Sequence, residues 1–162
     1  MQRNFPANIL FPTSFSDACF KTIPALSEWM DDPDTQLTIL HVYDAKKSKK
    51  AQVEQKLHSF FAEADQYGRC ERILIHGNPE TVILEQSLRN SYDLIFTPAS
   101  EPTGFPRFGH NSLRVNLIKN GSTPVWTSED LMNGMSMRRR PQSIAYVMTS
   151  ESNWQEQLIT AA

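Results

Sequence analysis

The sequence predicts an α/β fold: a three-layer sandwich with a five-stranded, mainly parallel sheet. Two observations carry this prediction. Short apolar runs alternate with amphipathic segments of helical period between residues 5 and 128, and strands that alternate with helices form parallel sheets covered on both faces. A chain of 162 residues with 40% hydrophobic and 21% charged residues is also typical of one soluble globular domain with a sizeable core.

The first strand is expected at Asn8–Thr13, and a helix follows it. Either Ser16 or Asp17 can cap this helix, and Pro24 inside it should kink or restart it. Four apolar positions of the helix fall on one face: Ala18, Ile23, Leu26 and Met30. The second strand is expected at Leu37–Tyr43.

A lysine-rich connection, Lys46–Lys50, leads into a long amphipathic helix that ends near Gly68. Its apolar positions are Val53, Leu57, Phe60, Phe61 and Ala64. The third strand is Glu71–His76. After it, Asn78 is placed as an N-cap and Pro79 as a first helical residue, which predicts a well-formed helix start.

The unit closes with a fourth strand at Tyr92–Thr97, a loop at Ala99–Ser112, a short helix at Leu113–Asn120 and a fifth strand at Ser122–Thr127. A loop between a strand end and a helix start can hold an anion on its backbone N–H groups. Close contact with phosphate usually needs glycine. This loop and the residue before it instead carry three prolines and an acid: Pro98, Glu101, Pro102 and Pro106.

Residues 129–142 are polar and suit a linker, and residues 143–162 are expected to form the strand and helix start of a second, incomplete repeat. At an offset of 135 residues, Ile144 aligns with Ile9, and Tyr146 with Phe11. A strand–helix pair cannot bury its apolar residues alone. We therefore expect residues 143–162 to pack against a sheet, either their own or that of a neighbouring chain, and not to be a disordered tail.

Composition and motifs exclude several classes of function. A net charge of −2 gives no general attraction to nucleic acid or to an anionic membrane. The basic clusters Lys46–Lys50 and Arg138–Arg140 are interpreted as solvated loops. Neither a signal peptide nor a membrane span is found, and Cys19 and Cys70 match no metal spacing, so a cytoplasmic protein with reduced thiols is expected. No catalytic motif is present, and we expect no enzyme.

The order of NILFPTSFSDA, LTILHVY, GNPETVI, DLIFTPAS and NSLRVNLIKNGSTPVW resembles the universal stress protein family. The resemblance implies a dimer formed through the last strand of the domain. ATP-binding members of that family carry Gly-x2-Gly-x9-Gly followed by Ser or Thr. Counting back from Ser112, which matches, the three glycine positions hold Pro98, Glu101 and Asn111. The acidic residue that faces adenosine falls on Ser14, whereas Pro12 and Val42 match their family positions.

Two hypotheses follow from these residues. The first is a regulatory or interaction module of the stress response that binds no ATP and has no cofactor. It would act as a homodimer or as a tandem pseudo-dimer, with a possible protein partner. The alternative is a protein that binds ATP, AMP or another small anion. In that case Arg107, His110 and Ser112 would replace the glycines, and Pro12, Ser14, Val42 and Asn111 would complete a vestigial or alternative pocket.

Single histidines have two interpretations. His41 lies at a strand end, where its imidazole could transfer a proton. The preferred interpretation is a packed histidine at the edge of the sheet, because no nucleophile accompanies it in the sequence.

Overall fold

The computed structural model describes residues 6–98 and 113–127. The expected linker, the second repeat and most of the loop between the fourth strand and the last helix lie outside these ranges. The strands are β1 (Asn8–Pro12), β2 (Gln36–Tyr43), β3 (Cys70–His76), β4 (Leu94–Phe96) and β5 (Val125–Trp126). The helices are α1 (Asp17–Lys21), α2 (Ile23–Met30), α3 (Lys50–Ser59), the 3-10 helix η1 (Ala62–Tyr67), α4 (Pro79–Arg89) and α5 (Leu113–Asn120).

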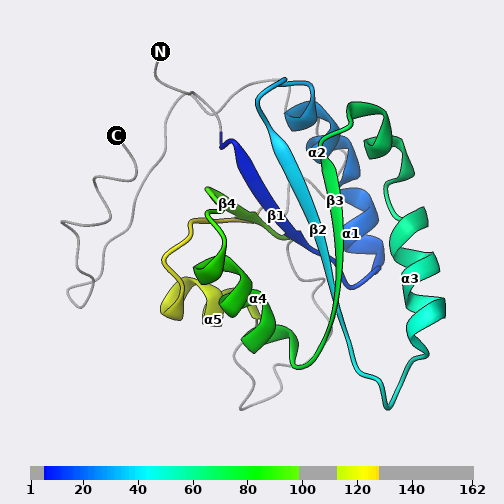
Figure 1. The fold of residues 1–162 in the computed structure, drawn as a ribbon. Coiled ribbons are helices and arrows are strands. Elements are labelled where there is room, and N and C mark those ends of the chain that lie inside the picture. Colours follow the sequence, from blue (N-terminus) through cyan, green and yellow to red (C-terminus); the bar gives the residue numbers. More distant parts are fainter. Residues whose placement is uncertain (1–5, 99–112, 128–162) are drawn as a thin grey trace.

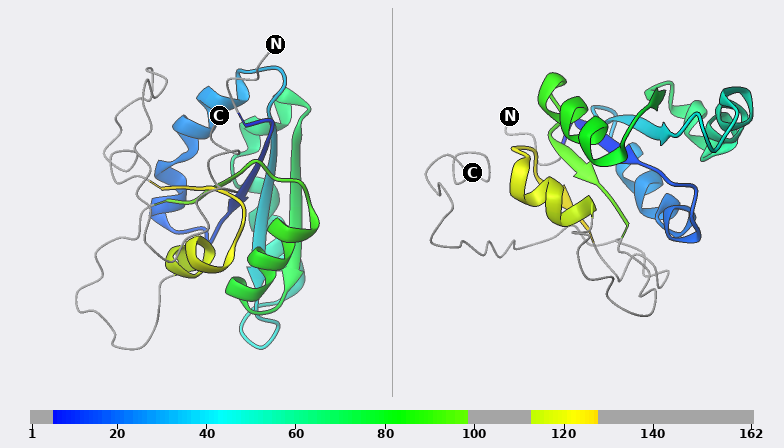
Figure 2. Two further views of the ribbon diagram at one scale, coloured as in Figure 1. Left: turned by 90° about the vertical axis from the view of Figure 1, so that its left-hand side faces the viewer. Right: turned by 90° about the horizontal axis from the view of Figure 1, so that it is seen from below.

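The strands form one five-stranded sheet in the order β3-β2-β1-β4-β5, and every pair of neighbours is parallel. The predicted fold class is therefore confirmed. Helices α1 and α2 cover one face of the sheet, and α4 and α5 cover the other (Figures 1 and 2). Because β1 lies in the middle, the chain first builds the sheet outward to β3 and then returns to the other side of β1 with β4.

The core consists of two apolar clusters, one on each face of the sheet. Ile9 and Phe11 of β1 point into the cluster that includes residues of α2 and α3. Leu10, between them, points into the cluster that includes Ile83 of α4 and Leu117 of α5. All three β1 side chains are at most 1% exposed. Because side chains point alternately to the two faces of a strand, β1 contributes to both clusters.

The long helix predicted between residues 50 and 68 is broken, which corrects the expectation. Helix α3 ends at Ser59, Phe60 is extended, and Phe61 has a left-handed backbone with φ 52°. The turn buries the Phe60 and Phe61 side chains against the cluster on that face. Pro24 restarts the first helix as expected: Thr22 separates α1 from α2, with the proline in the first turn of α2.

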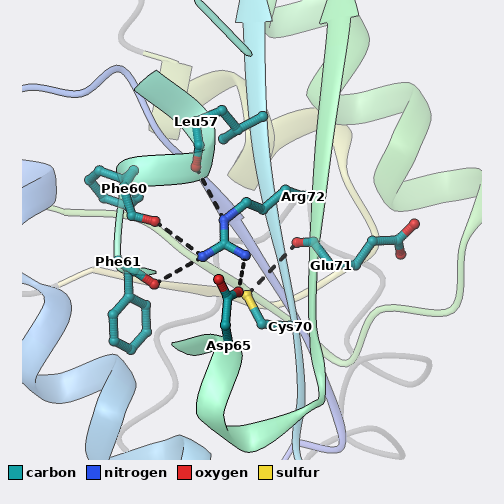
Figure 3. Close-up of polar contacts among 7 residues, drawn as sticks. All are labelled: Leu57, Phe60, Phe61, Asp65, Cys70, Glu71 and Arg72. Carbon is teal, nitrogen blue, oxygen red and sulfur yellow. Dashed lines mark hydrogen bonds and ion pairs between the residues drawn. The ribbon is translucent and has the colours of Figure 1, made fainter. Parts of the chain in front are cut away.

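Arg72 of β3 stabilises this break (Figure 3). Its Nε donates to the carbonyl oxygen of Leu57 over 3.1 Å, and its Nη2 donates to that of Phe61 over 3.0 Å. Its Nη1 pairs with the carboxylate of Asp65 in η1. The guanidinium group therefore supplies donors to the last carbonyls of α3 and to the left-handed turn, which the helix itself leaves unsatisfied.

Arg69, just before β3, bonds the last residue of α2 and the connection that follows this helix. Its Nη1 donates to the carbonyl oxygens of Asp32 over 2.6 Å and Thr35 over 2.7 Å. Its Nη2 donates to that of Met30 over 2.8 Å. Two arginines that flank the start of one edge strand thus fix the ends of two helices on the same face of the sheet.

Replacing Arg72 by Met should lower the free energy of unfolding by about 3 kcal/mol, because several carbonyl oxygens lose a charged donor. The Arg72 side chain is 8% exposed. The matched control is Arg89→Met, since the Arg89 side chain is 73% exposed and pairs with Glu85 on the surface of α4. That variant should change stability by less than about 0.5 kcal/mol. Urea unfolding followed by circular dichroism measures both, and equal effects would contradict this role for Arg72.

Candidate functional site

The candidate site lies at the carboxyl edge of the sheet, between β1 and β4. From β1 the chain proceeds toward β2 on one side, whereas β4 lies on the other, so this is a topological switch point. Ligands of open parallel sheets bind where such strands separate. Pro12 ends β1, and the register that pairs Leu10 with Ile95 brings Thr97 and Pro98 of the β4 end alongside it.

Ser14 lies in the loop after β1 and is exposed. Its Oγ is 3.6 Å from the Sγ of Cys19. Ser16 caps α1, because its Oγ accepts a hydrogen bond from the Cys19 N–H over 3.4 Å, which decides between the two caps that the sequence allowed. The position where the family resemblance places an acid therefore carries an uncharged hydroxyl group that contacts a thiol.

The pKa values of the two cysteine thiols are shifted in opposite directions. At Cys19, burial raises the pKa, but hydrogen bonds from Ser16 and Ser14 outweigh it, so the pKa is lowered overall. At Cys70, burial raises the pKa to about 11. Both are free thiols. Cys19 is only 2% exposed, and a thiol so buried has little access to a reactant.

His41 holds the loop after β1 in place. Its Nδ1 lies 2.7 Å from the carbonyl oxygen of Thr13. A carbonyl only accepts, so Nδ1 carries the proton of the neutral ring. The ring stacks on Phe15, with centroids 4.2 Å apart. Phe15 has a positive φ of 60°, which is uncommon for a bulky residue and persists only where its surroundings enforce it. The contacts match the packed role expected for His41.

The β4 side of the edge offers few backbone donors. The N–H of Thr97 is already bonded to the carbonyl oxygen of Trp126 over 3.0 Å. Pro98 follows, and proline has no N–H. Val42 lies at the end of β2 and packs against the cluster beneath α4. The structure thus gathers Pro12, Ser14 and Val42 at one edge of the sheet.

The other predicted site residues lie outside the described residues: Arg107, His110, Asn111 and Ser112. Sequence reasoning did not single out Thr13, Phe15 or Thr97. Thr13 and Thr97 could have been found because each directly follows a strand, but nothing in the sequence indicates the left-handed backbone of Phe15.

Within residues 6–98 and 113–127, no three His, Cys, Asp or Glu side chains come close enough together to hold a metal ion. In the same ranges, no helix has the length and apolarity that a membrane crossing requires.

Comparisons with known proteins identify the fold. Neither a protein-family model nor a curated protein matches the sequence. Solved structures do match. A hypothetical protein whose biochemical function was assigned from its structure superposes with a TM-score of 0.63 at 20% identity, over 74% of this chain and 93% of that one. A universal stress protein in complex with cAMP gives 0.62 at 16% identity, over 75% and 94%.

A universal stress protein family protein from Arabidopsis thaliana with AMP bound gives a TM-score of 0.58 at 19% identity, over 74% of this chain and 89% of that one. The chain therefore has the fold of the universal stress proteins, as the order of its motifs implied. Identities this low establish the fold and leave the ligand to be argued from the residues of this chain.

The stability of the protein should depend on His41 as the pH falls. Burial lowers the pKa of His41 below its ordinary 6.5, despite the bond to Thr13, and the charge of Lys56 lowers it further. Protonation then favours the unfolded chain, so the contribution of His41 is fully present above about pH 6.5 and is lost as the pH falls through that value.

The measurement is urea unfolding between about pH 8 and pH 5 for the wild type and for His41→Asn, whose amide can still donate to Thr13. The wild type should lose more stability than the variant across this range. His58→Asn, at an exposed position of α3, serves as the control and should follow the wild type. Parallel curves for all three proteins would show that His41 makes no such contribution.

Proposed function

We propose that this chain is a regulatory or interaction module of the universal stress protein type that works without bound adenine nucleotide. One observation carries the proposal. Related folds contain cAMP or AMP in their structures, whereas at the carboxyl edge of this chain Ser14 stands where the family resemblance places an acid, and it contacts Cys19. We further propose a cytoplasmic location and no catalytic activity.

The chemistry of the edge supports this proposal. Phosphate groups are held by several backbone N–H groups that converge, usually at glycines. At the first glycine position Pro98 provides none, and at the second Glu101 adds a negative charge that repels phosphate. An uncharged Ser14 also removes the carboxylate that family members direct at adenosine. Each change weakens a different part of nucleotide binding.

In the alternative function, a ligand binds at the same edge of the sheet but is held by side chains instead of backbone N–H groups. Arg107 and His110 bring cationic or neutral donors into the loop between β4 and α5, and Ser112 precedes α5 directly. Such side chains can bind an anion by charge where backbone donors are missing. ATP, AMP or a smaller anion would then be the ligand.

For its assembly, we propose a homodimer or a tandem pseudo-dimer that joins at β5, with a protein partner as a further possibility. Strand β5 is hydrogen-bonded to β4 alone among the described strands. The carbonyls of Pro124 and Trp126 accept from Ile95 and Thr97, so the backbone groups of Val125 between them face away from β4. An apolar edge strand of this kind is normally covered.

Thermal unfolding with millimolar ATP, AMP and cAMP tests the nucleotide proposal. A ligand at a hundred times its Kd would add about 2.7 kcal/mol, which raises the Tm of a domain of this size by roughly 5–10 °C. We expect no rise for the unmodified protein. A rise that disappears in Arg107→Gln would instead establish the alternative.

A combined variant tests whether the replaced acid and glycines are the reason that nucleotide does not bind. Ser14→Asp together with Pro98→Gly, Glu101→Gly and Asn111→Gly restores the family's acid and its three glycines, and should create a rise in Tm with ATP. The matched control joins Ser14→Asp to Pro102→Gly and Pro106→Gly, which loosen the same loop away from the motif positions. It should show no rise, and an equal response of both variants would mean that loop flexibility, not the motif, decides binding.

Light scattering tests the assembly. The chain has a mass of 18.5 kDa, and we expect a particle of twice that mass over a range of protein concentrations. A particle of single mass at every concentration would rule out the homodimer.

A further inference from the structure

Helix α5 carries apolar side chains on two sides. Leu117 is 1% exposed and packs, with Leu113, into the cluster between this helix and the sheet. Ile118, in contrast, is 60% exposed and Val115 is 38% exposed. A helix of a globular protein that covers one face of a sheet needs one apolar stripe. We call the second stripe, formed by Val115 and Ile118, the α5 outer face.

Exposed single apolar residues are common, but these two occur together. Of the four large hydrophobic residues that are this exposed in the described part of the chain, the α5 outer face contributes two, and the others are Phe20 and Leu88. Val115 and Ile118 are three positions apart in one helix, so they are neighbours on its surface.

The described chain ends beside this face. Arg114, one turn before Ile118, donates from Nη1 to the Oγ1 of Thr127 over 3.0 Å. Thr127 directly follows β5 and is the last described residue. Helix α5 itself lies at the outer margin of the described fold, on the side of β5 (Figure 2). Residues 128–162 therefore start next to the α5 outer face.

We propose that residues 150–162 of the same chain dock on the α5 outer face as an amphipathic helix. In this segment Trp154 and Leu158 are four positions apart, which places them on one side of a helix. Glutamate and glutamine occupy the intervening positions. Trp154 and Leu158 therefore offer one apolar side to the exposed parts of Val115 and Ile118.

The length of the connection permits this contact. Residues 128–149 join Thr127 to the docking segment. A random coil of this many residues would span roughly 25 Å, and the strand expected from residue 143 would extend that reach. The tether keeps the segment near its target at an effective concentration on the order of millimolar. A segment of the same chain is thus favoured over a free partner.

Charge also selects this occupant. Helix α5 carries Arg114 and Lys119 and no acidic residue. The segment 150–162 carries Glu151 and Glu156 and no basic residue. Opposite charges around an apolar contact orient the two helices and disfavour wrong partners.

Disulfide trapping in the full chain tests the contact directly. In a Cys70→Ser background, Ile118→Cys is combined with Leu158→Cys, and Leu88→Cys with Leu158→Cys is the control. Leu88 has the same exposed fraction as Ile118, 60%, but lies on α4. We expect the 118–158 pair to form an intramolecular disulfide at least about tenfold faster than the control, as seen by intact mass. A covalent dimer would show that a second copy occupies the face, and a rate equal to the control would show that the segment does not dock there.

Hydrogen exchange provides a measurement that needs no cysteine. The amides of residues 150–162 should exchange at least about tenfold more slowly than in an unstructured chain, which corresponds to about 1.4 kcal/mol. Ile118→Ser should remove this protection, whereas Leu88→Ser should leave it unchanged, with β1 equally protected in all three proteins. Protection that is absent in the wild type, or that survives in Ile118→Ser, would overturn the proposal.

Discussion

The rest of the structure depends on the burial of β1 on both faces of the sheet. Ile9, Leu10 and Phe11 lose almost all contact with water, and the alternation of a strand sends them to opposite sides. One row of helices cannot cover both sides, so the chain must place helices on each face and strands on each edge of β1. The same constraint creates the candidate functional edge, because the connections from the central strands diverge where β1 ends.

Fold and ligand chemistry are separable in this molecule. The chain has the fold of proteins whose structures contain cAMP or AMP. At the edge of this chain, the hydroxyl group of Ser14 contacts Cys19, and Pro98 follows the end of β4. A preformed loop remains, held by His41 and Phe15. The fold is therefore shared with nucleotide-bound structures, and the proposal that this chain binds no nucleotide depends on the residues at its own edge.

Sequence patterns predicted the parts of the fold that depend on burial and on local capping. The apolar runs gave all five strands, Ser16 was one of two expected caps, and Pro24 restarted a helix. The break after Ser59 was missed, because Phe60, Phe61 and Ala64 continue the apolar pattern of the helix although the backbone of Phe61 is left-handed. Arg69 and Arg72 were missed for a related reason: their partners are backbone carbonyls far away in the sequence. At the site, the family resemblance pointed to Pro12, Ser14 and Val42, which lie together at one edge of the sheet, but nothing in the sequence predicted the stacking of Phe15 on His41.

The most direct test of the central claim is a titration of the isotope-labelled full chain with ATP and magnesium, followed by amide NMR. We expect the amide signals of Ser14, Val42 and Thr97, which lie at the carboxyl ends of β1, β2 and β4, to keep their positions up to millimolar nucleotide. Saturable shifts of these signals, with the signals of β3 unchanged as an internal reference, would show that the edge binds adenine nucleotide and would contradict the proposed function.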